Sequence, residues 1–287
     1  MTGFLQQAFN GLVGGSFYAL LALGLTVIFG MLRVVNFAHG ALYMLGAFGA
    51  LVLTAAGVSF WVALVVVPIL MGVLGALVER FLVRHLSGLD PLYNFLLTFG
   101  LALVLQDAVR AKYGVQSQPF DHGPFHGSVN LGLFTFPAYQ VFVLVLSVLL
   151  CAGVWLVLSR SRVGTIIRAA TERPELSRAL GVNVGRWVTP AFGFGVALAA
   201  LAGVLAAPTR AVNSAMGADL IIVVFAVVVI GGLGSVFGSV LAGFVIGMVQ
   251  ALGNLYVPAL SQTLVFILMA VVLLVRPAGL FGTEEHA

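Results

Sequence analysis

Charged residues are scarce in this sequence, and only one cysteine is present. Of the 287 residues, 8% are charged and 61% are hydrophobic, whereas a soluble domain has about 25% charged and about 45–50% apolar residues. Because so few charges cannot cover a surface that faces water, the composition excludes an ordinary soluble domain and indicates a membrane protein. Cys151 is the single cysteine, so an intrachain disulfide is also excluded.

Lysine occurs only once, and its position excludes one source of energy. The phosphate-binding loop of a P-loop ATPase ends in Lys followed by Ser or Thr, but Lys112 is followed by Tyr113. The chain therefore lacks such an ATPase site. No nucleophile with a base, no pair of membrane carboxylates and no metal-ligand motif is visible, so neither enzymatic activity nor a cofactor or metal site is expected.

Ion-coupled transport is a second source of energy, and it usually requires an ionisable residue deep in a span. Asp107 is the candidate, but it lies near the expected outer end of a span, with Arg110 three residues further on. At that helical spacing the two side chains can form an ion pair. A structural pair is therefore favoured over a coupling site.

Long apolar runs joined by short polar segments are the main feature that is present. A helix that crosses a membrane needs about 20 apolar residues, and such runs predict an all-α, polytopic bundle of about eight or nine spans. The expected spans cover residues 9–30, 41–57, 60–78, 91–109, 137–158, 187–207, 220–230, 236–255 and 260–275. The run at 220–230 is short, so it is either a span or a re-entrant segment. We expect residues 1–287 to form a single integral-membrane domain.

The basic residues predict the orientation, because Lys and Arg in short connections stay on the cytoplasmic side. Six of them lie in residues 159–187, which we therefore expect to form a cytoplasmic loop. Counting spans from this loop assigns residues 110–136 to an external loop. The N-terminus is then outside and the C-terminus inside.

Several glycines recur at a spacing of four residues. Gly11 and Gly15 form such a pair in the first span, and Gly243 and Gly247 form another in a later span. In lipid, small residues at this spacing allow helix backbones to approach closely. These spans are therefore expected to take part in close helix packing.

Polar residues interrupt the apolar pattern between residues 31 and 40. Irregular backbone at membrane depth is tolerated only where it is buried in protein or lines a water-filled cavity. Asn36 and His39 therefore either support a gate near the inner face or act as helix-end and packing residues. Other residues with polar side-chain ends, in or beside apolar spans, are candidates for lining a transport pathway: Tyr18, Tyr43, Asn213 and Gln250.

The expected cytoplasmic loop contains signals for a short helix. Pro174 suits the first helical position, Glu175 the first turn and Gly181 the stop. Leu176 and Leu180 then give the helix a small apolar face. Such a face suits a groove on a soluble partner or the lipid headgroup region.

Short segments along nearly the whole chain resemble one family of transport proteins. They are GGSFYAL at 14–20, VNFAHG at 35–40, RAATERPELSRALG at 168–181, VNVGR at 182–186, ALAALAGVL at 197–205, GGLGS at 231–235 and RPAGLFG at 276–282. These segments are similar to LivH-type permeases, which belong to the branched-chain amino acid group of bacterial ABC importers.

The resemblance implies a multi-pass permease of the bacterial inner membrane, which forms a pathway with a second permease, either related or identical. It also implies two P-loop ATPase subunits at the cytoplasmic loops and a periplasmic binding protein that delivers branched-chain or related amino acids. Similar permeases transport urea, short amides or aromatic acids, so these compounds are alternative substrates. A self-sufficient channel or secondary transporter is the remaining alternative.

The resemblance also assigns the coupling to the ATPase to residues Thr171–Gly181. Pro174 and Glu175 would fix the coupling helix. Leu176 and Leu180 would then enter a groove on the ATPase subunit.

Overall fold

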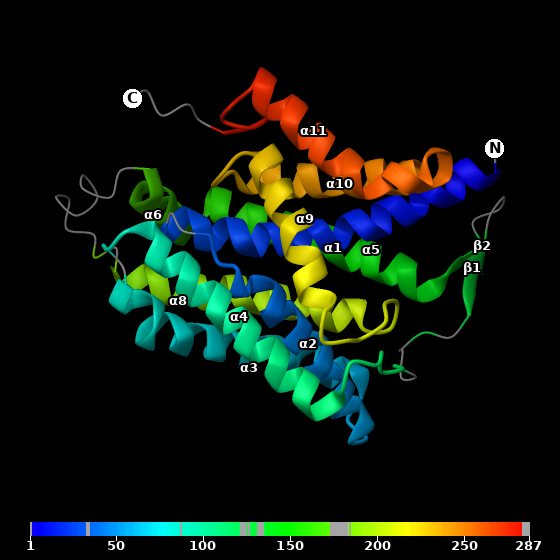
Figure 1. The fold of residues 1–287 in the computed structure, drawn as a ribbon, viewed down its shortest axis with the longest axis horizontal. Helices are drawn as coiled ribbons and strands as arrows, with labels where there is room; N and C mark the ends of the chain where they lie inside the picture. Colours follow the sequence, from blue (N-terminus) through cyan, green and yellow to red (C-terminus); the bar gives the residue numbers. More distant parts are fainter. Residues whose placement is uncertain are drawn as a thin grey trace. The chain divides into compact units, whose positions relative to one another are not determined.

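Helices make up nearly all of the regular structure. The computed structural model describes residues 2–32, 35–86, 88–120, 125, 127–130, 135–172, 183 and 185–282. Within these ranges the helices are α1 Thr2–Leu32, α2 Ala38–Ala55, α3 Phe60–Phe81, α4 Pro91–Tyr113, α5 Ala138–Arg160, α6 Arg162–Glu172, α8 Gly185–Ala206, α9 Met216–Gly231, α10 Val236–Tyr256 and α11 Ser261–Val275 (Figure 1). The shorter elements are the 3₁₀ helices η1 Val83–Leu86 and η2 Pro258–Leu260 and the strands β1 Ser128–Asn130 and β2 Thr135–Pro137.

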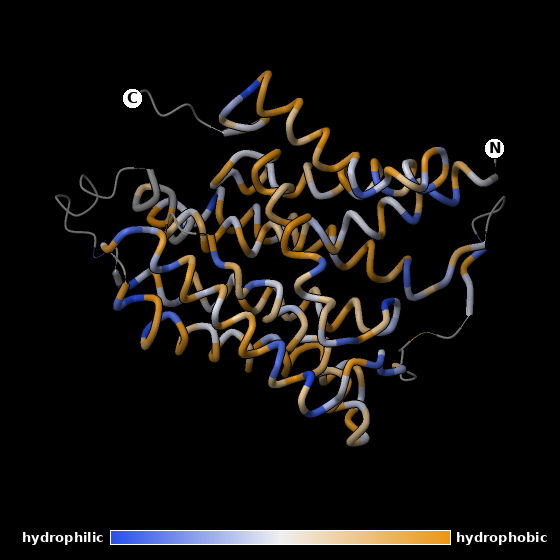
Figure 2. Tube along the Cα trace, viewed as in Figure 1, coloured by the Kyte–Doolittle hydropathy of each residue, from blue (hydrophilic) through white to orange (hydrophobic). Residues whose placement is uncertain are grey.

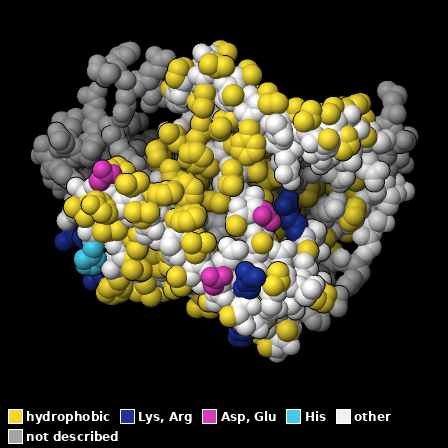
Figure 3. Space-filling view, in the orientation of Figure 1, with side chains coloured by type: hydrophobic (Ala, Val, Ile, Leu, Met, Phe, Trp, Pro, Cys, Tyr) yellow, Lys and Arg dark blue, Asp and Glu magenta, His cyan; other side chains and the backbone are white. Residues whose placement is uncertain are grey.

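The all-α polytopic architecture is confirmed. Over the described ranges, eight helices are long and apolar enough to cross a membrane, and α9 is a shorter apolar helix. Hydrophobic residues dominate these helices in Figure 2, and Figure 3 shows few charged side chains on the face that it draws. The 16 residues of α9 extend about 24 Å at about 1.5 Å per residue, less than the hydrocarbon thickness of about 30 Å.

Several helices extend beyond the apolar runs that predicted them, and α1 and α4 are two examples. α1 begins at Thr2, in a polar first section where Asn10 Nδ2 donates to Gln7 Oε1 at 3.3 Å. α4 continues to Tyr113 and ends at Gly114, whose φ of 77° favours glycine. Hydropathy alone misses these sections because polar residues interrupt their apolar runs, whereas the helical hydrogen bonding continues through them.

Both expected loops contain regular structure of their own. β1 and β2 pair antiparallel inside the expected external loop, with Val129 opposite Phe136. α6 lies in the expected cytoplasmic loop, where Ser161 Oγ accepts a hydrogen bond from Gly164 N–H at 3.1 Å. Three-residue strands and one amphipathic helix produce no long apolar run, so the span pattern does not reveal them.

The chain divides into two compact units, and the helices α1, α5 and α9 contribute residues to both units. In the unit formed by residues 24–122 and 153–221, α8 packs against α2 and α3. A Cβ added to Gly203 of α8 would lie only 2.1 Å from the Tyr43 carbonyl oxygen of α2. The two backbones are therefore in direct contact.

The other unit comprises residues 1–23, 123–152 and 222–287. Here the predicted small-residue packing is confirmed between α1 and α10. A Cβ on Gly247 would lie 2.3 Å from Gly15 Cα, and one on Gly243 would lie 2.6 Å from the Ala19 nitrogen. Because lipid supplies no hydrophobic force between helices, such contact is a main source of their association.

The segment that follows α11 folds back onto the end of α9 within the same unit. Leu280 N–H donates to the Ile230 carbonyl at 2.9 Å, and Phe281 N–H donates to the Gly231 carbonyl at 3.1 Å. Two of the segments that carry the family resemblance, 231–235 and 276–282, therefore lie against each other.

Gly247→Ala is expected to destabilise the protein in detergent by about 1–3 kcal/mol, because the new methyl group would overlap the α1 backbone. The midpoint of thermal unfolding measures this loss. Gly14→Ala is the matched control, since nothing lies within 4 Å of a Cβ added there. Equal midpoints for the two variants would contradict the contact between α1 and α10.

Candidate transport pathway and coupling site

Asn36 lies in the irregular segment between α1 and α2. It is 2% exposed, and its side-chain oxygen accepts a hydrogen bond from Ala38 N–H at 3.1 Å. Its carbonyl oxygen accepts from His39 N–H at 3.2 Å. Asn36 therefore satisfies backbone donors at the start of α2, which is a capping role. Its role at a gate stays a prediction.

The same segment is attached to α4. Phe37 N–H donates to Thr98 Oγ1 at 3.3 Å. Among the described residues, the Nδ2 atom of Asn36 and the Oδ1 atom of Asn94 are buried and have no hydrogen-bond partner. The segment before α2 is therefore held against α4 through Thr98.

His39 and Tyr43 are fully buried, one turn apart on α2. A Cβ added to Gly24 of α1 would lie 3.1 Å from His39 Cε1 and 2.7 Å from the Gly195 carbonyl oxygen of α8. His39 thus lies where α1 and α8 approach each other. In this structure both side chains belong to the packed interior of their unit.

Tyr18 and Gln250, two of the expected pathway residues, contact each other. Tyr18 Oη donates to Gln250 Oε1 at 2.5 Å, and the bond connects α1 to α10. Asn213 lies in the turn before α9, where its side-chain oxygen accepts from Ala215 N–H at 2.9 Å. Tyr18, Gln250 and Asn213 therefore each form a hydrogen bond within the chain.

The expected coupling residues begin in α6 and continue along the chain toward α8. Thr171 is in the last turn of α6, whereas Pro174, Glu175, Leu176, Leu180 and Gly181 lie outside the described residues. The described flanks show how this segment is attached. α6 ends just before it, and α8 begins at Gly185 just after it.

Glu79 is a functional candidate that the sequence pattern does not single out. This carboxylate, near the end of α3, is 1% exposed. Its Oε2 accepts a hydrogen bond from Thr189 Oγ1 of α8. The bond fixes α3 to the first turns of α8, directly after the expected coupling segment. In sequence Glu79 looks like one more charge in a polar joint, because its partner is 110 residues away.

Side chains that could bind a metal do not cluster in the part of the chain that the structure describes. No group of three or more His, Cys, Asp or Glu residues there could hold a metal ion. The described helices form a polytopic membrane protein in which an irregular, partly polar segment lies in the interior.

Comparison with known proteins identifies the family. A family model described as "Branched-chain amino acid transport system / permease component" matches residues 7–273. The chain belongs to this permease family. It is a multi-pass protein of the inner membrane and a transport subunit, not an enzyme, and it works in a complex with other subunits.

Individual relatives match over nearly their full lengths. BraD of Pseudomonas aeruginosa, a high-affinity branched-chain amino acid transport system permease protein, is 32% identical, with 98% of this chain and 97% of BraD covered. LivH of Escherichia coli, which has the same description, is 30% identical over 98% of this chain and 96% of LivH. A probable branched-chain amino acid transport permease protein of Methanocaldococcus jannaschii is 27% identical, with 96% of this chain and 91% of that protein covered.

One solved structure supports the fold alone. A chain of PsaBC from Streptococcus pneumoniae, in complex with a Fab, matches with a TM-score of 0.50 and 12% identity. The match covers 95% of this chain and 90% of that chain.

Thr189→Val is expected to destabilise the protein by about 1–3 kcal/mol, because it leaves the buried Glu79 carboxylate without its hydroxyl donor. Thermal unfolding in detergent measures the change. Thr189→Ser keeps the hydroxyl and should unfold close to the wild type. If Thr189→Val and Thr189→Ser unfold at the same temperature, the bond does not stabilise α3 against α8.

Proposed function

We propose that this chain forms, with a second permease, the translocation pathway of an ABC importer for branched-chain or related amino acids. The observation that carries the proposal is the family match over residues 7–273, together with relatives named as branched-chain amino acid permeases. The partners are a second permease, related or identical, two P-loop ATPase subunits and a periplasmic substrate-binding protein. The absence of a P-loop from the sequence agrees with ATP hydrolysis by separate chains.

The mechanism is alternating access driven from the cytoplasmic side. ATP closes the ATPase pair, the segment Thr171–Gly181 moves with it, and the two permeases open outward to receive the substrate. In this chain the Glu79–Thr189 bond supports the proposal, because it attaches the helix after the coupling segment to α3. A displacement of that segment would therefore shift α3 and α8 together.

The residues proposed for the pathway divide into two groups. Asn36 and His39 would support a gate near the inner face, where two polar residues already interrupt the apolar pattern. Tyr18, Tyr43, Asn213 and Gln250 would exchange their present local contacts for contacts with substrate or water as the pathway opens. The close Tyr18–Gln250 bond would then be one of the contacts that differ between the two states.

Purification of the tagged chain in mild detergent tests the partners. A P-loop ATPase and a second permease should be recovered with it. The double variant Leu176→Ala/Leu180→Ala should reduce the recovery of the ATPase by about tenfold or more, because it removes two apolar anchors. Val157→Ala, on an exposed position of α5, is the control. Recovery of the chain alone, while a known importer stays intact, would favour a channel or secondary transporter.

The orientation is tested by cysteine labelling in a Cys151→Ala background. Ser117→Cys should react with a membrane-impermeant maleimide on intact cells, whereas Thr165→Cys should react only after the cells are opened. The reason is that basic residues keep the loop containing α6 on the cytoplasmic side of the membrane. Both positions are exposed. The reverse labelling pattern would show that the N-terminus is cytoplasmic.

A further inference from the structure

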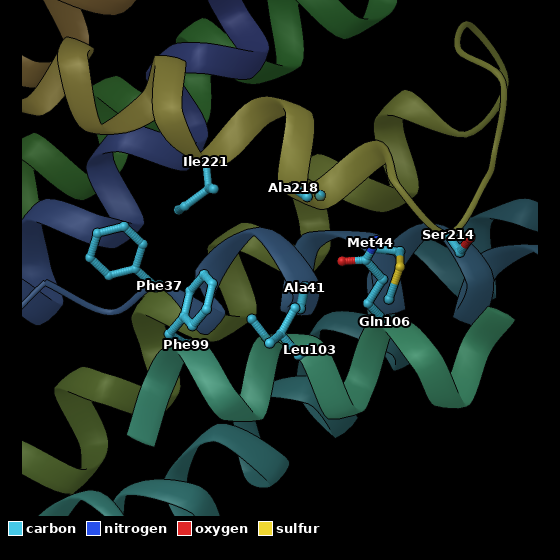
Figure 4. Close-up of a pocket in the computed structure, with 11 residues that line it drawn as sticks. Phe37, Ala41, Met44, Phe99, Leu103, Gln106, Ser214, Ala218 and Ile221 are labelled. Carbon is cyan, nitrogen blue, oxygen red and sulfur yellow. The ribbon is translucent and has the colours of Figure 1, made fainter. Parts of the chain in front are cut away.

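A cavity lies between α2, α4 and α9 in the unit formed by residues 24–122 and 153–221. Its volume is about 80 Å³. Figure 4 shows Phe37, Phe99 and Ile221 at one end, with Met44, Gln106 and Ser214 toward the other. Resting on the proposed function, we propose that this cavity receives the aliphatic side chain of the transported amino acid.

The chemistry of the lining suits a hydrocarbon group. All of the residues that line the cavity are uncharged, and apart from Gln106 and Ser214 they are apolar or glycine. A charged group would lose its hydration at the apolar end, where no polar side chain lines the cavity. A few polar groups at one end of an apolar pocket are typical of small-molecule sites, where they orient the ligand.

The size of the cavity favours an aliphatic side chain over an aromatic ring. An apolar cavity of roughly 150 Å³ is the size that holds benzene. The cavity here, at about 80 Å³, is close to half of that. A branched side chain of about three or four carbon atoms is therefore a better fit than the ring of an aromatic amino acid.

Aromatic contacts fix the apolar end of the cavity. The Phe37 ring meets the Phe95 ring edge to face, with centroids 4.9 Å apart. Phe95 in turn stacks on Phe99, with centroids 5.9 Å apart. Phe37 and Phe99 are thus held relative to each other before a ligand arrives, and preorganisation of this kind lowers the entropy lost on binding.

A glycine contact sets the distance between α2 and α9 at the edge of the cavity. A Cβ on Gly40 would lie 2.3 Å from the Gly217 carbonyl oxygen, and a Cβ on Gly217 would lie 2.2 Å from the Gly40 carbonyl oxygen. Gly217 itself lines the cavity, and Ala41 beside Gly40 does so as well. The close approach of the two backbones therefore determines the width of the site.

The polar end matches the rest of an amino acid. The Gln106 carboxamide both donates and accepts hydrogen bonds, and the Ser214 hydroxyl does the same. They can therefore contact the ammonium and carboxylate groups without placing a fixed charge in the pathway. Weak, uncharged contacts of this kind favour passage over tight retention.

The first test is cysteine protection in the purified complex with its ATPase subunits, in a Cys151→Ala background. Leu103→Cys lines the cavity, while Val104→Cys is the next residue on α4 and lies outside the lining, and both positions are exposed. Saturating leucine should slow the reaction of Leu103→Cys with N-ethylmaleimide by about threefold or more, because a bound side chain covers it. Glycine and phenylalanine should not, and Val104→Cys should react at an unchanged rate.

The second test does not depend on cysteine chemistry. Ala218→Leu fills the cavity, and it should lower binding-protein-dependent leucine uptake by the complex in proteoliposomes by about fivefold or more. Ala215→Leu, exposed one turn earlier and outside the lining, should stay within about twofold.

The outcomes separate this inference from the proposed function. If the wild-type complex takes up leucine, but leucine gives no selective protection of Leu103→Cys and Ala218→Leu transports like Ala215→Leu, the cavity is not the side-chain site and the importer assignment stands. If the wild-type complex takes up no branched-chain amino acid at all, the proposed function fails and the cavity assignment falls with it.

Discussion

Direct contact between helix backbones is the constraint on which the rest of this structure depends. Lipid supplies no hydrophobic force to bring helices together, so their association relies on close packing. In one unit α1 meets α10 through Gly15 and Gly247, and in the other α2 meets α9 through Gly40 and Gly217. The second contact also limits the width of the cavity beside it. Packing and the proposed substrate site therefore have a common origin.

Two side-chain hydrogen bonds connect helices within the units. Tyr18 and Gln250 connect two helices of one unit, and Glu79 and Thr189 connect two helices of the other. The bond between Glu79 and Thr189 lies near the start of α8, which follows the expected coupling segment along the chain. If partner subunits supply the energy, as we propose, the Glu79–Thr189 bond would carry their movement into α3 and α8.

The spans were predictable because each needs a run of apolar residues long enough to cross lipid. Helix α6, the β1–β2 hairpin and the first residues of α1 were not, because they produce no such run. The family resemblance pointed to a coupling segment, but its central residues lie outside the described ranges. The Glu79–Thr189 bond and the cavity near Leu103 depend on segments far apart in sequence, so no local pattern reveals them.

The most direct test of the account is substrate uptake by proteoliposomes that contain this chain with or without its partners. We expect no leucine uptake by the chain alone, under a proton gradient, a sodium gradient or a leucine gradient. We expect ATP-dependent uptake once the second permease, the ATPase subunits and the binding protein are present. Saturable uptake by the chain alone would contradict the account, because this chain would then provide both the pathway and its driving force.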